Sequence, residues 1–216
     1  MSMLAVLTPG TPATEALGRV LDAKAIPAQL QGVDSSSAAA ILEKDHQRLA
    51  AQLVAGWLST RESVWWGCLC LAQLMKVGTS PGASERLQAV LAWVKEPGDA
   101  RREAIGPLDD MTGTPVDMLA QAVSFTTDNL SPNKDHPVAC PTALAHRMVA
   151  QSVLLAIDHW PGPNKNECLA HFVELGLDVA EGLHMWTKGA LPLHPGLRRG
   201  ADPTTIRKTG KIWENW

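Results

Sequence analysis

The stretch 60–76 constrains the fold most, because it is apolar on nearly every side of the helix that it predicts. It opens at Ser59-Thr60-Arg61-Glu62, in which the serine hydroxyl and the glutamate carboxylate are spaced to cap each other's backbone amides. The apolar side chains that follow are Val64, Trp65, Trp66, Cys68, Leu69, Cys70, Leu71, Leu74 and Met75. A helix that is apolar all round is covered on several sides, and the longest apolar run here, nine residues, is too short to span a bilayer. The stretch therefore predicts the central helix of a globular domain.

Amphipathic helices are predicted on both sides of this stretch, and no segment shows the sustained alternation of apolar and polar residues that is typical of strands. The helical ranges are a short one from about Thr11, then 36–58, 84–94, 99–105, 114–125, 141–159 and 165–182. With 45% hydrophobic residues, a chain of 216 residues can bury a core without metals or disulfides. We predict an all-α fold, a compact bundle of about six to eight helices. Residues 11–186 would form a single domain, followed by an irregular tail at 187–216.

A weak internal repeat suggests how some of these helices pair. Residues 54–68 and 156–168 both read as the end of a helix, a tryptophan, a turn, and a second helix that carries a cysteine. Two stacked helical hairpins would fit this pattern.

Three stretches resemble a family of bacterial proteins known only as a domain of unknown function. They are Arg61 to Cys70, with its Arg-Glu-Ser-Val-Trp-Trp-Gly-Cys sequence, the segment from Trp93 to Ala104, and the helix from Ala143 to Ala156. The resemblance covers roughly residues 50–160 and brings no established activity. It implies a bacterial protein linked to secretion, type VI systems among them. Members often carry a Gly/Ser-rich loop where 126–137 stands here, so this chain departs from the family pattern at that loop.

The polar connection 126–141 is the longest between two predicted helices, and it holds three prolines. A loop of this length in a compact helical domain is either disordered or functional. The sequence leaves both interpretations open.

Arg61 and Trp65 are the first candidate binding residues. Arginine and tryptophan dominate the energetics of protein interfaces, so the pair could form an exposed anchor for a partner. The structural alternative is that Glu62 caps the helix, Arg61 pairs locally, and the tryptophans Trp65 and Trp66 fill the core. The capping motif favours the structural alternative.

The C-terminal tail supplies the other candidates. Residues 187–216 hold six basic and two acidic residues, a net charge of +4, whereas residues 1–186 carry −7. The candidate binding residues in this tail are Arg198, Arg199, Arg207, Lys208, Lys211, Trp213 and Trp216. Such a tail can bind an acidic partner through charge and stacking, or it can wrap the acidic body. We expect it to pack, at least at Trp213, on its own chain or a symmetry mate, because exposed tryptophans favour aggregation.

Recognisable catalytic and metal-binding motifs are absent from the sequence. Cys68 and Cys70 lie two apart, so on a helix their side chains diverge by about 200° and cannot chelate one ion. The sequence contains no HExxH, P-loop, dinucleotide or Gly-x-Ser-x-Gly motif. We therefore predict free cysteines, with no metal, no cofactor and no catalytic residues. The alternative is a small enzyme whose site is assembled in three dimensions from His146, His159 and Asp158.

Together these features predict a non-enzymatic helical adaptor or accessory protein that binds another protein. The first residues lack the basic region followed by an apolar region that is typical of a signal peptide. The cysteines are interpreted as reduced thiols, and both features predict a cytoplasmic location. The acidic body argues against nucleic acid as a partner, and no membrane insertion is expected. The sequence leaves open whether the protein forms a homo-oligomer.

Overall fold

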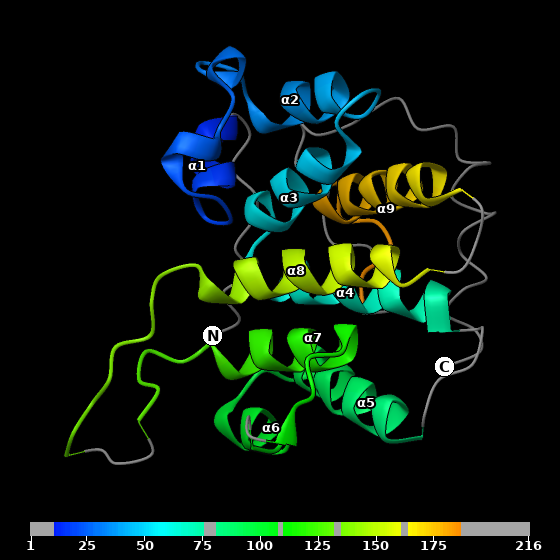
Figure 1. Cartoon of the computed structure of the whole chain (residues 1–216). Helices are drawn as coiled ribbons and strands as arrows, with labels where there is room; N and C mark the ends of the chain where they lie inside the picture. The colour runs from blue at the N-terminus through cyan, green and yellow to red at the C-terminus, as the bar shows by residue number, and fades with distance from the viewer. Residues whose placement is uncertain (1–10, 76–80, 108–109, 132–134, 161–163, 187–216) are drawn as a thin grey trace.

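The computed structural model describes residues 11–75, 81–107, 110–131, 135–160 and 164–186, and this part of the chain is all-α, as predicted (Figure 1). Its only strand-like pairings are two isolated β-bridges. The helices are α1 (Ala13–Gly18), α2 (Ser35–Leu42), α3 (Gln47–Trp57), α4 (Thr60–Met75), α5 (Pro81–Lys95), α6 (Asp99–Glu103), α7 (Pro115–Ser124), α8 (Leu144–Asp158) and α9 (Lys165–Ala180). Two short 3-10 turns, Ala23–Ala25 and Ala28–Leu30, join α1 to α2.

The helices are arranged in layers (Figure 1). From the top of that view, α1 and α2 cover α3 and α9, which lie on α4 and α8, and α5, α6 and α7 lie below. Helix α4 therefore lies at the centre, against α3, α5, α7, α8 and α9, which confirms the prediction from its apolar sequence. The hairpins α3–α4 and α8–α9 pack directly against each other. None of the helices in the described ranges is long and apolar enough to cross a membrane.

Trp66 lies at the centre of the core. Its side chain is fully buried, and its indole Nε1 donates a hydrogen bond of 2.8 Å to the carbonyl oxygen of Phe172 on α9. The close approach of α9 requires a glycine, because a Cβ atom at Gly176 would lie 2.2 Å from Val54 Cγ1 and 2.9 Å from Trp66 Nε1. The polar tip of the tryptophan thus finds a partner inside the core, which burial of an indole N–H requires.

One predicted helix was wrong: the range 36–58 is broken into α2 and α3. The break falls at Glu43-Lys44-Asp45-His46, four polar residues that offer nothing to bury. The backbone of His46 leaves the helical conformation, and the chain changes direction there, so that both helices bury their alanine and leucine faces. The other boundaries differ by a few residues: α5 begins at Pro81 rather than at Ser84, and α8 at Leu144 rather than at Pro141.

Candidate functional site

An open groove is the candidate site. It has a volume of about 850 Å³ and lies where the first residues of α4 and α8 meet the last residues of α5 and α7. Its lining is divided among these four helix ends and the connection from α7 to α8. The lining residues are Thr60, Arg61, Trp93, Lys95, Glu96, Pro97, Phe125, Thr126, Thr127, Asp128, Cys140, Pro141, Thr142, Ala143, Ala145 and His146. Aromatic, basic and acidic side chains thus share one open surface.

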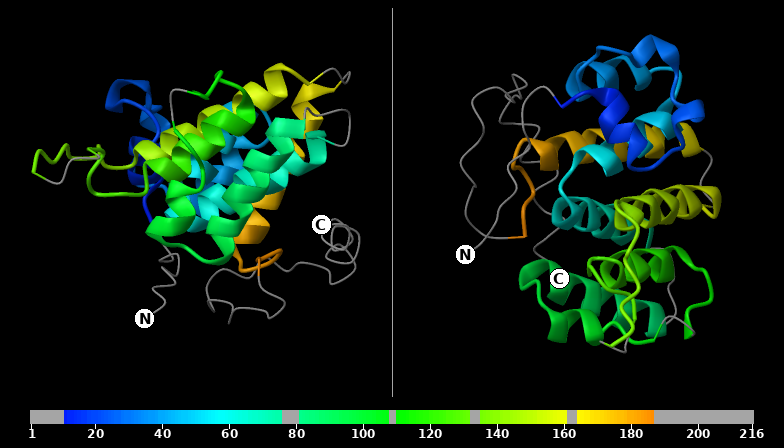
Figure 2. Two further views of the ribbon diagram at one scale, coloured as in Figure 1. Left: turned by 90° about the horizontal axis from the view of Figure 1, so that it is seen from below. Right: turned by 90° about the vertical axis from the view of Figure 1, so that its left-hand side faces the viewer.

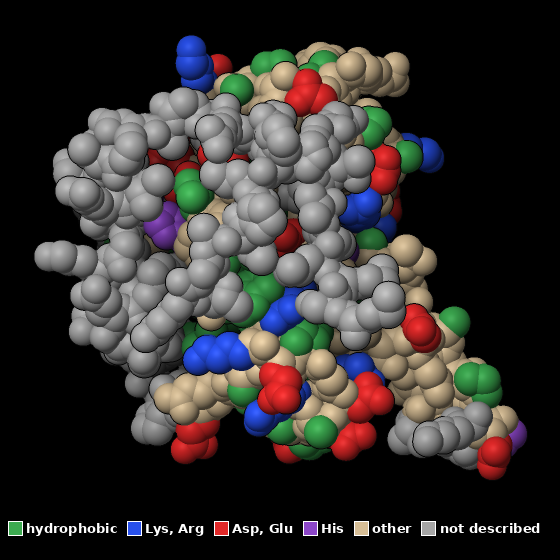
Figure 3. All heavy atoms as spheres, turned by 180° about the vertical axis from the view of Figure 1, so that it is seen from behind, with side chains coloured by type: hydrophobic (Ala, Val, Ile, Leu, Met, Phe, Trp, Pro, Cys, Tyr) green, Lys and Arg blue, Asp and Glu red, His purple; other side chains and the backbone are tan. Residues whose placement is uncertain are grey.

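The connection between α7 and α8, residues 126–142, is here called the arm, and it projects from the body next to the groove (Figures 1 and 2). Its two halves run antiparallel: Leu130 N donates to Val138 O (2.7 Å), and Cys140 N donates to Asp128 O (3.1 Å). The space-filling view from behind shows the arm standing clear of the helical layers (Figure 3). The described residues of the long polar connection are therefore an ordered projection.

Asn129 organises the arm from within. Its side-chain Oδ1 accepts hydrogen bonds from the backbone N–H groups of Ser131 (2.9 Å) and Val138 (2.8 Å), one from each half of the arm. Beyond this point the residues His136 to Ala139 are all exposed, and Val138 is 55% exposed. Few large apolar side chains in the described part of the chain are this open; Ile41 on α2 is another, at 54%.

The start of α8 forms one wall of the groove and has no side-chain cap. Its N-cap residue is Ala143, which has no side-chain hydrogen-bonding group and adopts a left-handed conformation with φ of 65°. The first N–H groups of a helix need acceptors from outside the helix, and they carry the positive end of the helix dipole. The connection itself supplies one acceptor, because Leu144 N donates to the carbonyl oxygen of Pro141 at 3.2 Å.

His146 and Cys140 line the groove but do not form an activated nucleophile. The Nε2 atom of His146 lies 3.2 Å from the carbonyl oxygen of Leu58, and because a carbonyl only accepts, Nε2 carries the proton. Burial, and to a smaller extent the charge of Arg19, lowers the pKa of His146 to about 4. The Cys140 thiol donates to Phe125 O at 3.4 Å, and burial together with Asp128 raises its pKa. The histidine is therefore neutral and the cysteine a thiol at neutral pH.

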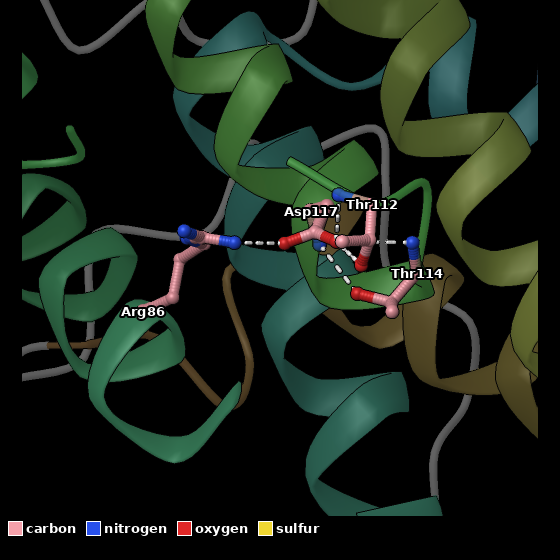
Figure 4. A network of polar contacts seen from close by, with 4 residues as sticks. All are labelled: Arg86, Thr112, Thr114 and Asp117. Atoms are coloured by element: carbon pink, nitrogen blue, oxygen red, sulfur yellow. Dashed lines mark hydrogen bonds and ion pairs between the residues drawn. The ribbon is translucent and has the colours of Figure 1, made fainter. Parts of the chain in front are cut away.

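A buried carboxylate joins α7 to α5 (Figure 4). Asp117, which is only 3% exposed, pairs with Arg86 of α5 and accepts hydrogen bonds from the backbone N–H groups of Thr112 and Thr114. Burial alone would raise the pKa of Asp117, but its hydrogen bonds with Thr114, Arg86 and Thr112 outweigh burial and lower the pKa to about 2. Together with Thr114, Asp117 forms the capping box of α7. It joins α5 to the start of α7, and neither Asp117 nor Arg86 lines the groove.

Arg61 and Trp65, predicted as candidate binding residues, are both engaged within the chain. Arg61 donates from Nε to Val94 O (2.7 Å) and from Nη2 to Lys95 O (3.0 Å), at the end of α5. Trp65 is 4% exposed, and its Nε1 donates to His184 O at 2.6 Å. These contacts favour the structural interpretation of the pair, although the Arg61 side chain also lines the groove. The predicted capping pair of α4 is present, with Ser59 N donating to Glu62 Oε2 at 3.0 Å.

The remaining predicted residues fall into two groups. Arg198, Arg199, Arg207, Lys208, Lys211, Trp213 and Trp216 lie outside the described residues. His146, Asp158 and His159 do not converge, because His146 is near the start of α8 and the other two are at its end, about 18 Å along the helix axis. Asp158 instead pairs with Arg48 at 2.7 Å, and His159 is exposed. Sequence reasoning singled out the 126–141 connection but missed the groove beneath it, whose walls come from segments far apart in the chain.

The described residues hold no group of three or more His, Cys, Asp or Glu side chains placed to bind a metal ion. All four cysteines, each of them in a described segment, are free.

Comparison with known proteins adds one match. The model of a family of unknown function matches residues 37–180. This range runs from within α2 to the end of α9 and includes both the arm and the groove. No curated protein and no solved structure matches the chain.

Proposed function

The chain belongs to DUF6931, the family of unknown function whose model matches residues 37–180, and for this member we propose a role as an adaptor that binds another protein through the arm and the groove. The observation that carries the proposal is the ordered arm, which projects from the body (Figure 2) and on which Val138 is 55% exposed. A segment that is held in shape by hydrogen bonds loses little entropy on binding, which favours affinity. The groove at its base adds an adjoining concave surface with both apolar and polar lining.

The charge distribution favours a protein partner over a nucleic acid. Residues 85–135, which form α5, α6, α7 and half of the arm, carry nine acidic and five basic residues, a net charge of −4. Acidic side chains are spread over the lower layer of the molecule as seen from behind (Figure 3). An acidic surface repels a phosphate backbone, whereas protein interfaces with an apolar centre and a polar rim are common.

The test compares two equally exposed apolar residues. Val138→Asp on the arm would place a charge at the proposed contact, and Ile41→Asp on α2 is the matched control, since the two side chains are 55% and 54% exposed. Tagged full-length protein and both variants are used to capture partners from the native host, and the bound proteins are quantified by mass spectrometry. We expect a partner whose recovery falls about ten-fold or more with Val138→Asp, as for an interface hot spot, and is unchanged with Ile41→Asp. If every captured protein binds the Val138 variant as well as the unaltered chain, the proposal is wrong.

The sequence resemblance gives this proposal its most specific form. In that form the protein is bacterial, acts in the cytoplasm, and its partner is a component of a secretion system of the type VI class. Capture from a host strain that lacks its secretion genes would then recover no Val138-dependent partner. Recovery of the same Val138-dependent partner from both strains would show that the partner is not a component of the secretion system, while leaving the adaptor role in place.

A further inference from the structure

The segment that follows α9 folds back onto α4 and ends beside the groove. The ring of Trp186 stands edge-on to that of Trp65, with centroids 6.2 Å apart and an interplanar angle of 83°. The guanidinium of Arg61 lies over the Trp186 ring, 4.1 Å from its centroid. A cation over an aromatic face and an edge-to-face ring pair are both attractive arrangements. Residue 186 is therefore fixed to the body at a defined place.

That place is the rim of the groove, because Arg61 belongs to both sites. The same side chain stacks on Trp186, bonds the carbonyls at the end of α5, and lines the groove. Thirty residues, 187–216, continue from this point. Fully extended they would span about 100 Å, so the groove is well within their reach. A segment tethered this close has an effective concentration in the millimolar range, and it needs little intrinsic affinity to bind.

The tail carries apolar and basic side chains that individual groups of the groove can contact. Residues 207–216 read Arg-Lys-Thr-Gly-Lys-Ile-Trp-Glu-Asn-Trp, with three basic residues before the first tryptophan. The groove offers Phe125, two prolines and the largely buried Trp93 as apolar contacts. Its charged lining is mixed: Asp128 and Glu96, which also pairs with Arg101, are acidic, and Arg61 and Lys95 are basic. The start of α8 has no side-chain cap, so an acceptor such as the side chain of Glu214 or Asn215 could serve as one.

We propose that residues 207–216 of the same chain are the resident occupant of the groove, with Trp213 against its apolar lining and the basic residues towards Glu96 and Asp128. The inference goes beyond the proposed function and does not depend on it, since no external protein is needed. If both hold, a partner that uses the groove must displace the tail, whereas a partner that uses only the arm need not.

A native cysteine in the groove provides the test. Cys140 lines the groove and is half-buried, so a second cysteine held nearby can form a disulfide with it under mild oxidation by oxidised glutathione. Asn215→Cys introduces that cysteine two residues from Trp213 in the full-length chain. Ala201→Cys is the matched control, on the same tail but outside the docking segment. Disulfides are mapped by mass spectrometry in the monomer fraction, and Cys168 serves as an internal competitor.

We expect the Cys140 disulfide to form about ten-fold faster with Asn215→Cys than with Ala201→Cys, because docking raises the local concentration above that of a freely moving tether. Adding Trp213→Ala to Asn215→Cys should remove this difference. Glu96→Lys should reduce it, since it replaces an acidic lining residue by a basic one. Equal rates for the two cysteine positions, or an Asn215→Cys rate that is insensitive to Trp213→Ala, would overturn the proposal. A disulfide found only between two chains would also overturn it, in favour of a tail that docks on a second copy.

Discussion

At the scale of single residues, tryptophan provides both bulk and a polar tip in this protein. Trp65 and Trp66 are neighbours, so on a helix they point about 100° apart. Trp66 faces α9 and donates to Phe172 O, whereas Trp65 faces the segment after α9 and donates to His184 O. One dipeptide thus fixes α4 both to the core and to the segment that leads into the tail.

Trp66→Ala should lower the free energy of unfolding by about 3–5 kcal/mol, because it empties the largest fully buried side-chain volume in the core. Trp66→Phe keeps much of that volume and leaves the Phe172 carbonyl without its donor, so its loss should be smaller. Urea denaturation followed by circular dichroism measures both. A loss for Trp66→Ala below 1 kcal/mol would contradict the burial of this residue.

Asp117→Asn should lower the free energy of unfolding at pH 7 by about 1–3 kcal/mol, since it removes the charge from several hydrogen bonds. The pKa of Asp117 is lowered from 3.8 to about 2. A carboxylate with a lowered pKa contributes stability above its unfolded pKa, and this contribution is lost as the pH falls through the folded pKa. The difference between wild type and variant should therefore shrink between pH 4 and about pH 2.

The control for Asp117 is Asp158→Asn. Asp158 also pairs with an arginine, Arg48, but both side chains are about half exposed, so the loss should stay below about 1 kcal/mol. Urea midpoints at several pH values compare the two variants. Equal losses at pH 7 would show that the buried network has no special role.

At the scale of helices, close packing depends on glycines at contact points. Gly56 lies where α3 meets α1: a Cβ atom there would sit 2.0 Å from the carbonyl oxygen of Ala16. Arg19 of the same turn donates to Gly56 O at 2.9 Å. Backbone atoms cannot rotate away as a side chain can, so any larger residue must push α1 off α3.

Gly56→Ala should therefore destabilise the protein by about 1–3 kcal/mol despite the better helix propensity of alanine. Gly18→Ala in α1 is the matched control, because nothing lies within 4 Å of its would-be Cβ and its φ is not positive. That variant should be neutral or up to about 1 kcal/mol more stable. Thermal melts compare the melting temperatures of the two variants. Equal melting temperatures would contradict the close contact of α1 with α3.

Asn129→Ala should loosen the arm without unfolding the domain, because its two backbone hydrogen bonds lie within the arm itself. We expect faster hydrogen exchange at the Val138 amide and faster proteolysis within 126–142, with a change in the free energy of unfolding of about 0.5 kcal/mol or less. Asn166→Ala, at an exposed position of α9, is the control and should leave the arm unchanged. Unchanged exchange at Val138 in the Asn129 variant would show that the arm keeps its shape by other means.

At the scale of the whole molecule, charge is separated between the acidic body, at −7, and the basic tail, at +4. Opposite charges on one chain attract at short range, and the attraction is screened by salt. The segment that ends at Trp186 already joins the start of the tail to the body through Arg61. The molecule is thus arranged so that the tail begins next to the acidic layer.

Deleting residues 197–216 should lower the melting temperature or change the oligomeric state, because the tail is expected to cover part of the body. Differential scanning calorimetry measures the melting temperature, and light scattering measures the oligomeric state. Added salt should reduce the difference in melting temperature between the full-length and the truncated protein. If the truncated protein melts at the same temperature and keeps its size, while a captured partner is lost, the tail is a binding segment for that partner instead.

The sequence by itself determined the helical class, the central position of α4 and the capping of α4, because periodicity and caps are local properties of the chain. It also singled out the 126–141 connection by its length. It did not reveal the break between α2 and α3, because the apolar residues on either side of 43–46 keep the spacing of one continuous helix. Only the tertiary packing makes the chain change direction there. The tertiary structure alone decided that Trp65 is enclosed and that Arg61 joins α5, Trp186 and the groove. The groove itself is formed by ends of helices whose residues lie up to 86 positions apart, from Thr60 to His146, and no local pattern encodes which distant ends will meet.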